Sequence, residues 1–418
     1  MKKVLFISYF WPPSGKASLH WPLDIIRHLP KDEIEPIILT VEDESFTQKD
    51  NSLQRKVDPS WIILKSKALE PFDIYRKFIG KRKDDKLVSS ETISLENKNL
   101  THRISIWIRM NIFVPDARIG WYFTALKEAK KFIKKNKIDS IVSIGPPHSS
   151  HLIGLKLSRI FSLPHIPVLI DPWVDIIYYK NFNRNIVALK LDNHFEKSVL
   201  QNAKQVVFVN KSTQEDFLKK YDFLKAKTNV LYWGYDEDDF KDLKIEKISK
   251  DEKIVVHAGN LFAYQNPKNF WKQIKIENEK GNNFKVKFIG TVDPVILNFL
   301  NEIGLRDKVE LIGFLPYSEM LKQILEADAL LVCASEPRHV PGKLFEALRT
   351  GNPIIAFGNK NDEVKEIIEL ASAGMMFSYE ESGEKFFSYL NQYKTDIEQI
   401  KFYDRENISA KLLQIMTS

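Results

Sequence analysis

The chain has 418 residues, a formal net charge of +7 at pH 7, and a composition that is 44% hydrophobic and 28% charged. These values are typical of a soluble globular protein with two domains of ordinary size. The single cysteine, Cys333, excludes an internal disulfide framework and fits a reducing compartment. No apolar run reaches the length of a transmembrane helix. The short apolar run after Lys3 predicts a first strand rather than a signal peptide, so we expect a cytoplasmic protein.

The first half of the chain alternates apolar runs with polar clusters. Strands of a buried parallel sheet are predicted at residues 4–9, 35–41, 139–144, 167–170 and 205–209. A helix is predicted at residues 17–29. Polar clusters follow three of these strands, at residues 11–16, 145–151 and 171–173. Ligands of open α/β sheets bind at the carboxyl ends of the strands, so we expect these clusters to face a ligand.

Residues 66–137 interrupt this alternation. Residues 77–86 are strongly basic, residues 88–101 form a polar loop, and the flanking segments carry aromatic and aliphatic residues. Two interpretations are open. The segment attaches to an anionic membrane surface, or it is a helical excursion packed on the first domain with a solvated basic tip.

The second half begins a new alternation. Strands are predicted at residues 253–257, 286–290, 309–315, 330–332 and 354–357, and a last helix at residues 408–416. Between the last two strands, Pro341 and Gly342 open a helix that Gly351 ends. The amino terminus of this helix predicts unpaired amides from Gly342 to Phe345, Lys343 adds a full charge, and both favour a phosphate. At Glu346, one turn further on, a carboxylate could accept hydrogen bonds from a ribose diol. The alternative is an ordinary βαβ unit with a surface lysine and glutamate.

This stretch resembles the nucleotide-sugar site of retaining glycosyltransferases of family 4, in the subgroup with the pattern P-x-K-x-x-E-Y-L-x-x-G-x-P-I-I-A. The matching residues are Pro341, Lys343, Glu346, Leu348, Gly351, Pro353, Ile354, Ile355 and Ala356. Three further motifs of the subgroup occur in order, P-D-A-x-x-G-W from Pro115, G-P-P-H-S-S-H-L-x-G from Gly145, and D-P-W from Asp171. The resemblance covers nearly the whole chain.

The resemblance implies an α/β chain of the GT-B fold, with two Rossmann-like domains facing each other across a cleft. The implied parts are an acceptor domain (residues 1–235), a nucleotide-sugar domain (236–395) and a C-terminal helix that returns to the first domain (396–418). The implied reaction transfers a sugar from a nucleotide diphosphate to an acceptor hydroxyl with retained configuration. UDP- or GDP-sugars are the expected donors, and no metal or resident cofactor is expected.

The resemblance also assigns residues to the site. Donor-binding positions are Gly259, Asn260, Phe314, Leu315, Arg338, Gly342, Lys343, Leu344 and Glu346. In the first domain, His148 or His151 is expected to contact sugar or acceptor. Acceptor-side loop positions are Pro13, Gly15, Lys16, Asp171 and Trp173. Of these residues His148, His151, Lys343 and Glu346 are the catalytic candidates, and for Phe314 a core position is an equal alternative.

The chain departs from the family pattern at several points. Gln265 stands where relatives carry an arginine that reaches the diphosphate, and Glu336 and Glu346 are separated by nine residues where the wider family has seven. The Asp-Phe-Arg that precedes D-P-W in relatives is absent. Two alternatives therefore stay open, a non-catalytic nucleotide-sugar binding protein and a GT-B epimerase. The expected partners are a nucleotide sugar, a glycan or lipid-linked acceptor in bacterial surface polysaccharide synthesis, and the cytoplasmic face of an anionic inner membrane, but no nucleic acid.

Overall fold

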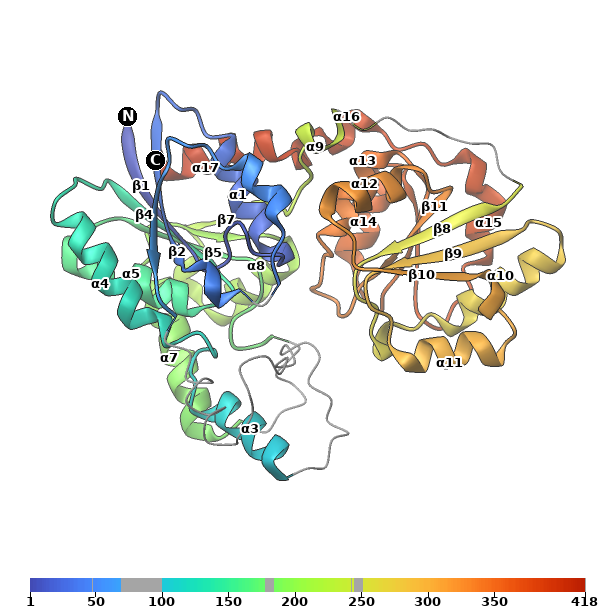
Figure 1. Ribbon diagram of the computed structural model, residues 1–418, viewed down its shortest axis with the longest axis horizontal. Helices are drawn as coiled ribbons and strands as arrows, with labels where there is room; N and C mark the ends of the chain where they lie inside the picture. Colours follow the sequence, from blue (N-terminus) through green and yellow to red (C-terminus); the bar gives the residue numbers. More distant parts are fainter. Residues whose placement is uncertain (47, 69–99, 177–183, 242, 244–250, 418) are drawn as a thin grey trace. The chain divides into compact units, whose positions relative to one another are not determined.

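The computed structural model describes residues 1–46, 48–68, 100–176, 184–241, 243 and 251–417. The chain divides into two compact units, unit 1 with Met1–Leu231 and Ser409–Ser418, and unit 2 with Tyr232–Ile408. Each unit is built on one parallel sheet with helices on both faces (Figure 1). The basic segment 77–86 and the apolar residues at 72–78 lie outside the described residues.

Unit 1 has a seven-stranded sheet in the order β3-β2-β1-β4-β5-β6-β7. Its strands are β1 (Lys2–Ser8), β2 (Ile34–Val41), β3 (Ile62–Ser66), β4 (Ser140–Gly145), β5 (His165–Leu169), β6 (Val206–Phe208) and β7 (Thr228–Val230). Its helices are α1 (His20–Arg27), α3 (Leu100–Asn111), α4 (Trp121–Ile133), α5 (Ser149–Phe161), α7 (Ile186–Asn202) and α8 (Lys211–Lys220). The strand order reverses between β1 and β4, so the loops after these two strands define the ligand-binding edge expected for such a sheet.

Unit 2 has a six-stranded sheet in the order β10-β9-β8-β11-β12-β13. Its strands are β8 (Lys253–Ala258), β9 (Phe284–Ile289), β10 (Val309–Gly313), β11 (Ala329–Cys333), β12 (Ile354–Phe357) and β13 (Gly374–Phe377). Its helices are α9 (Asp238–Lys241), α10 (Lys268–Glu279), α11 (Pro294–Glu302), α12 (Tyr317–Leu325), α13 (Lys343–Thr350), α14 (Asp362–Leu370), α15 (Glu384–Tyr389), α16 (Ile397–Ile400) and the start of α17 (Arg405–Thr417). Here the strand order reverses between β8 and β11.

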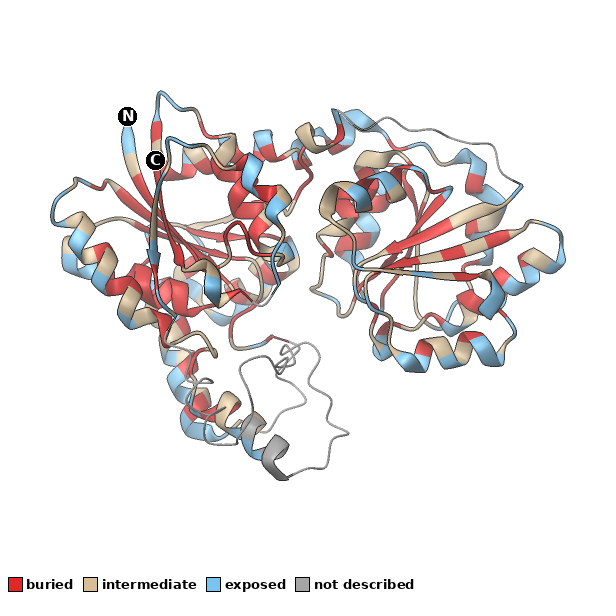
Figure 2. Ribbon diagram, in the orientation of Figure 1, coloured by how far each residue is buried: buried red, intermediate tan, exposed pale blue. Residues whose placement is uncertain are grey.

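Side chains that alternate along the strands of unit 2 build two separate cores. Along β11, Leu330 and Val332 join a core with residues of α12, α13 and α14, whereas Leu331 and Cys333 join a core with residues of α10, α11 and α15. Successive strand side chains point to opposite faces, so a strand covered on both faces has to be apolar at every position. Strands β11 and β12 are accordingly buried at every position (Figure 2).

The predicted fold class is confirmed, including the returning helix. Helix α17 starts in unit 2, and its residues from Ser409 onward belong to unit 1, where Ser409 Oγ donates to the Ile25 carbonyl at 2.8 Å. The helix predicted at residues 17–29 is wrong at its start, because residues 17–19 form a 3₁₀ turn and α1 begins at His20. Strands β3, β7 and β13 were not predicted. They are short, and each lies at an edge of its sheet or beside one, where the apolar signal is weak.

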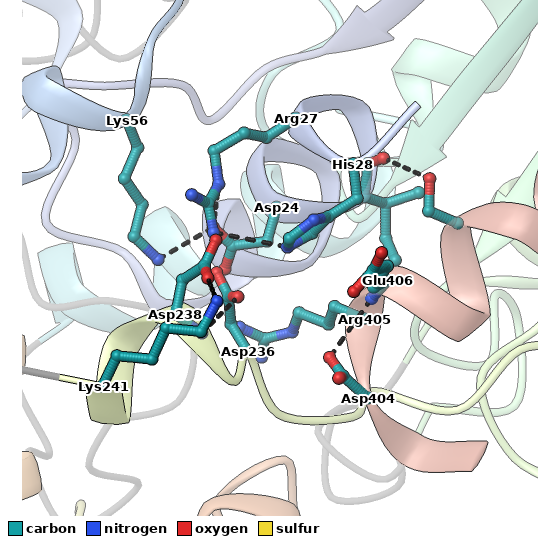
Figure 3. A network of polar contacts seen from close by, with 12 residues as sticks. Asp24, Arg27, His28, Lys56, Asp236, Asp238, Lys241, Asp404, Arg405 and Glu406 are labelled. Atoms are coloured by element: carbon teal, nitrogen blue, oxygen red, sulfur yellow. Dashed lines mark hydrogen bonds and ion pairs between the residues drawn. The ribbon is translucent and has the colours of Figure 1, made fainter. Parts of the chain in front are cut away.

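One buried ion pair secures the edge of unit 1 next to α1. Lys56 Nζ lies 2.9 Å from Asp24 Oδ1, and both side chains are buried (Figure 3). A buried charge is tolerated where an opposite charge and further hydrogen bonds surround it. The pair therefore gives the buried carboxylate of α1 an opposite charge.

Candidate functional site

The strand reversal of unit 2 brings two loops together at one edge of the sheet. Gly259 directly follows β8, and residues 334–342 connect β11 to α13. Because β8 and β11 are neighbours, the loop at Gly259 and the amino terminus of α13 meet at the carboxyl edge of the sheet. This edge holds the positions predicted to bind a nucleotide diphosphate.

Lys343 is the charged group at this edge. Its Nζ lies 3.4 Å from Nε2 of His257, whose Nδ1 lies 2.9 Å from the Leu331 carbonyl. The carbonyl requires a proton on Nδ1, so Nε2 accepts from the lysine. Burial lowers the pKa of Lys343 to about 8 and that of His257 to about 3. The arrangement is a partly buried ammonium group held by a neutral histidine, poised for an anionic ligand.

The absence of a side chain at Gly259 leaves space for the Lys343 ammonium group. The residue has a φ of +113°, and a Cβ atom added to it would lie 2.5 Å from Lys343 Nζ. We expect Gly259→Ala to displace the lysine and to weaken nucleoside diphosphate binding about tenfold, in addition to a stability loss of about 1–2 kcal/mol from the left-handed backbone. Calorimetric titration and thermal unfolding measure the two effects.

Gly281 offers the matched control. Its φ is +91°, but no atom lies within 4 Å of the position that a Cβ would occupy. Gly281→Ala should therefore show the stability loss without the loss of binding. Equal binding by both variants would contradict the placement of the ligand beside Lys343.

Glu346 lies one helical turn after Lys343 and is only 5% exposed. Its Oε1 accepts from the Tyr317 hydroxyl at 3.1 Å and lies 3.6 Å from the Arg405 guanidinium. Its Oε2 is buried and has no hydrogen-bond partner among the described residues. Burial raises the pKa of Glu346 to about 6, opposed chiefly by Arg405. A buried carboxylate oxygen without a partner is costly, so this residue has the character of a binding group rather than a structural one.

The amino terminus of α13 differs in part from the prediction. The amides of Leu344 and Phe345 donate to the carbonyls of Pro341 and Gly342, at 2.9 and 3.1 Å, so the expectation that they are unpaired is wrong. The first turn of α13 is a tight turn in which these two amides make hydrogen bonds to the carbonyls three residues earlier, so they are not available to a ligand. Leu344 is fully buried in the core. Gly342 and Lys343 keep their places at the helix start, and the indole of Trp233 packs so closely on Gly342 that a Cβ there would lie 2.7 Å from it.

The other predicted donor-binding residues are spread along the same edge. Asn260 accepts from the hydroxyl of Thr291 at 2.7 Å, and the Arg338 guanidinium lies 3.2 Å from a Glu336 carboxylate oxygen. Phe314 is 61% exposed, which rules out the core position that the sequence left open, whereas Leu315 packs against the core. Both follow β10, as a base-binding loop at this edge would.

Gln265 has a structural role here. Its Nε2 donates to the Cys333 carbonyl at 3.0 Å and its Oε1 accepts from the Phe262 amide at 3.2 Å. The side chain is buried and joins the loop after β8 to the end of β11. The position that carries an arginine in relatives therefore holds the two loops of the site together.

The two histidines predicted in unit 1 are both buried. His148 stacks on Trp173 with ring centroids 4.8 Å apart, and His151 Nδ1 lies 2.8 Å from Ser143 Oγ. Desolvation lowers the pKa of both, that of His148 to about 3. Both rings are covered because α5 packs its first turn inward. A contact with sugar or acceptor stays a prediction and requires these rings to be uncovered.

The acceptor-side positions divide into buried and accessible ones. Trp173 is buried, with Nε1 donating to Asp192 at 2.7 Å, and Pro13 is also buried. Gly15, Lys16 and Asp171 are partly exposed at the edge of the sheet where β1 and β5 end. The motif residue Trp173 is thus part of the core, because an indole of this size is more stable against His148 than in water.

Several residues around the site were not predicted. These residues are Trp233, His257, Tyr317, His339 and Arg405. His257 carried a detectable signal, a titratable residue near the carboxyl end of a strand and just before a glycine loop. Arg405 carried none, because its partner Glu346 is remote in sequence and no short pattern links them.

Comparisons with known proteins find relatives for unit 2 and for the whole fold. Residues 238–401 match the model of the family "Glycosyl transferases group 1". The chain is 19% identical over 259 residues to an uncharacterised glycosyltransferase of Haemophilus influenzae, covering 61% of this chain and 67% of that protein. Sucrose-phosphate synthase from Thermosynechococcus elongatus has a similar structure, with a TM-score of 0.68, 13% identity and coverage of 100% and 98%.

A second similar structure is that of the Anabaena protein Alr3699/HepE in complex with UDP, with a TM-score of 0.61, 14% identity and coverage of 100% and 98%. At these identities the structural matches establish the fold, and the family match shows what residues 238–401 are similar to. Residues 238–401 are therefore similar to the glycosyl transferases group 1 family, within a chain of the GT-B fold.

Proposed function

We propose that the protein is a retaining glycosyltransferase that moves a hexosyl group from a nucleotide diphosphate to a hydroxyl of a glycan or lipid-linked acceptor. One observation carries the proposal. A partly buried lysine and a buried glutamate with an unpartnered oxygen lie one turn apart on α13, at the strand reversal of unit 2. A diphosphate and a ribose diol are the groups that such a pair would bind.

The chemistry follows from the charges. As the bond between the anomeric carbon and the diphosphate breaks, negative charge develops on the leaving phosphate oxygen, and the Lys343 ammonium neutralises it. Such preorganised charge is commonly the largest part of catalysis. Glu346 fixes the ribose and so places the phosphates at the start of the helix. The lysine supplies the positive charge that a divalent cation would otherwise bring, and EDTA should leave the activity unchanged.

The function is tested by incubating the protein with UDP- and GDP-sugars and a panel of glycan and lipid-linked acceptors. We expect release of one nucleoside diphosphate, and NMR should show a product with the anomeric configuration of the donor. Binding without release across the whole panel would favour a non-catalytic binding protein. Interconversion of sugar nucleotides without an acceptor would favour an epimerase.

The pKa of Lys343 predicts how donor binding depends on pH. The lysine pKa is lowered to about 8, so the free protein loses this charge as the pH rises through 8. A diphosphate requires the charged form, and its affinity should fall by up to about tenfold between pH 8 and pH 9. Calorimetric titrations with UDP and GDP at pH 7, 8 and 9 measure the change. Lys343→Arg stays charged over this range and should give a flat profile, and an equally flat wild-type profile would contradict the prediction.

We also propose that a surface of unit 1 contacts an anionic membrane, where a lipid-linked acceptor would lie. Exposed apolar side chains lie on α3 and α7, which pack together through the Arg184 side chain and the Met110 carbonyl. They are Ile104, Trp107, Ile186, Val187 and Leu191. The sequence of α3 contains no acidic residue, and both acids of α7 are buried, Asp192 against Arg184 and Glu196 against Lys220. The exposed side chains described on α3 and α7 are therefore apolar, basic or neutral polar, and none is acidic, which favours anionic lipid headgroups.

No helix among the described residues is both long and apolar enough to cross a bilayer. The proposed contact is tested by sedimentation with vesicles of phosphatidylcholine, with and without phosphatidylglycerol. We expect binding only to the anionic vesicles. The pair Val187→Glu and Leu191→Glu should abolish it, while the pair Val295→Glu and Leu370→Glu, at exposed positions of unit 2, should not. Binding that survives the charge pair would contradict the assignment.

A further inference from the structure

Arg405 approaches Glu346 from a different part of the chain. It is the first residue of α17, next to Asp404 (Figure 3), and its side chain is fully buried. Its Nε donates to the Trp233 carbonyl at 3.2 Å, its backbone amide donates to the Tyr235 carbonyl at 2.8 Å, and its Cζ lies 5.9 Å from the centre of the Trp233 ring. These contacts fix the guanidinium group before any ligand binds.

The guanidinium and the Tyr317 hydroxyl both approach the same oxygen of Glu346. The distances to Oε1 are 3.6 Å and 3.1 Å, and Oε2 is the oxygen without a partner. A carboxylate held through one oxygen cannot turn that oxygen to a ligand. We propose that Arg405 is a positioning residue for the donor: it keeps Glu346 charged and directs Oε2 to the ribose hydroxyls of the nucleotide.

This inference rests on the proposed function and deepens it, because it names a residue that controls ribose recognition without touching the nucleotide. The charged and titratable groups that act on Glu346 are Arg405 from α17, Tyr317 from α12, Asp239 from α9, and Lys343 from its own helix. Asp239 disfavours the carboxylate, and Arg405 is the largest favourable influence on it. Loss of Arg405 should therefore leave Glu346 neutral at physiological pH, where it would bind the ribose less well.

The inference has a test that needs no nucleotide. Unfolding free energies of the wild type, Arg405→Gln, Glu346→Gln and the double variant are measured at pH 5 and pH 8. We expect Arg405→Gln to destabilise far more at pH 8 than at pH 5, because only the ionised carboxylate loses its counter-charge. In the Glu346→Gln background this pH dependence should vanish. An equal cost at both pH values and in both backgrounds would show that Arg405 only packs against Trp233, and would overturn the inference.

The second arm measures binding of UDP and GDP, each compared with its 2′-deoxy form. The wild type should prefer the ribose form about tenfold or more, and Arg405→Gln should lose most of that preference at pH 7. Arg405→Lys should keep part of it. If Arg405→Gln does not fold, Tyr317→Phe gives a smaller shift in the same direction. An unchanged ribose preference in these variants would contradict the positioning role.

The two proposals fail in different ways. If the wild type binds no nucleotide, the proposed function fails, while the unfolding cycle still reports whether Arg405 and Glu346 are coupled through charge. If nucleotides bind but the unfolding free energies show no coupling between Arg405 and Glu346, the proposed function is supported and the positioning role of Arg405 is contradicted.

Discussion

Lys343→Ala is expected to reduce glycosyl transfer by about 10²–10³-fold, the cost of removing one preorganised group that stabilises a developing negative charge. The helix start and Glu346 remain in the variant, so donor binding should fall less than turnover. The fold should not suffer, because Lys343 is a partly buried charge whose removal eliminates a desolvation cost. Steady-state kinetics with the donor identified by nucleotide release measures kcat and KM separately.

Lys268→Ala is the matched control for this variant. Lys268 also begins a helix of unit 2, α10, but it is exposed and its Nζ lies 5.5 Å from the centre of the Phe299 ring. Loss of a lysine from this helix should change kcat little. A similar loss in both variants would show that general positive charge, and not the position of Lys343, supports the reaction.

Trp173→Ala is expected to destabilise unit 1 by about 3–5 kcal/mol, the usual cost of removing a large buried aromatic side chain. The indole stacks on His148 and donates to Asp192, so its loss leaves a cavity and removes a partner of a buried carboxylate. Trp173→Phe keeps a ring against His148 and should cost only about 1.5–3 kcal/mol, the value of one hydrogen bond to a charged group. Urea unfolding measures both.

Trp107→Ala provides the control for Trp173, because Trp107 is 52% exposed on α3 and its removal should change the stability by less than about 0.5 kcal/mol. If Trp173→Ala instead leaves the stability intact and impairs transfer, then Trp173 faces the acceptor as the sequence motif implied. The structural role assigned to it would then be wrong.

The fold was largely predictable because its signal is repeated. Each buried strand of unit 2 has to be apolar on both faces, as Leu330 and Leu331 illustrate by entering different cores. The loops between strands and helices carry turn residues, which mark where each element ends. The family motifs occur along the chain in the expected order. The short strands β3, β7 and β13 escaped because three to five residues at or near a sheet edge carry too little apolar pattern.

The site was predictable where one helix carries it. Lys343 and Glu346 belong to a single local pattern, and the helix joins them in space. Burial was not predictable, since the pattern around His148 and His151 is polar in sequence yet packs inward against Trp173. Contacts between segments that are distant in the sequence could not be predicted either. Arg405 meets Glu346, and Trp233 meets Gly342, only because the chain folds back through unit 2.

The central claim is that a nucleoside diphosphate binds at the carboxyl edge of the unit 2 sheet. The most direct test of this claim is to measure hydrogen–deuterium exchange in the presence and absence of UDP or GDP, whichever is found to bind. We predict slower exchange in peptides covering residues 257–262 and 335–346, the two loops that meet at Lys343, and a smaller change in Lys343→Ala at the same nucleotide concentration. Saturated binding with unchanged exchange in both peptides, or slower exchange confined to unit 1, would contradict the account.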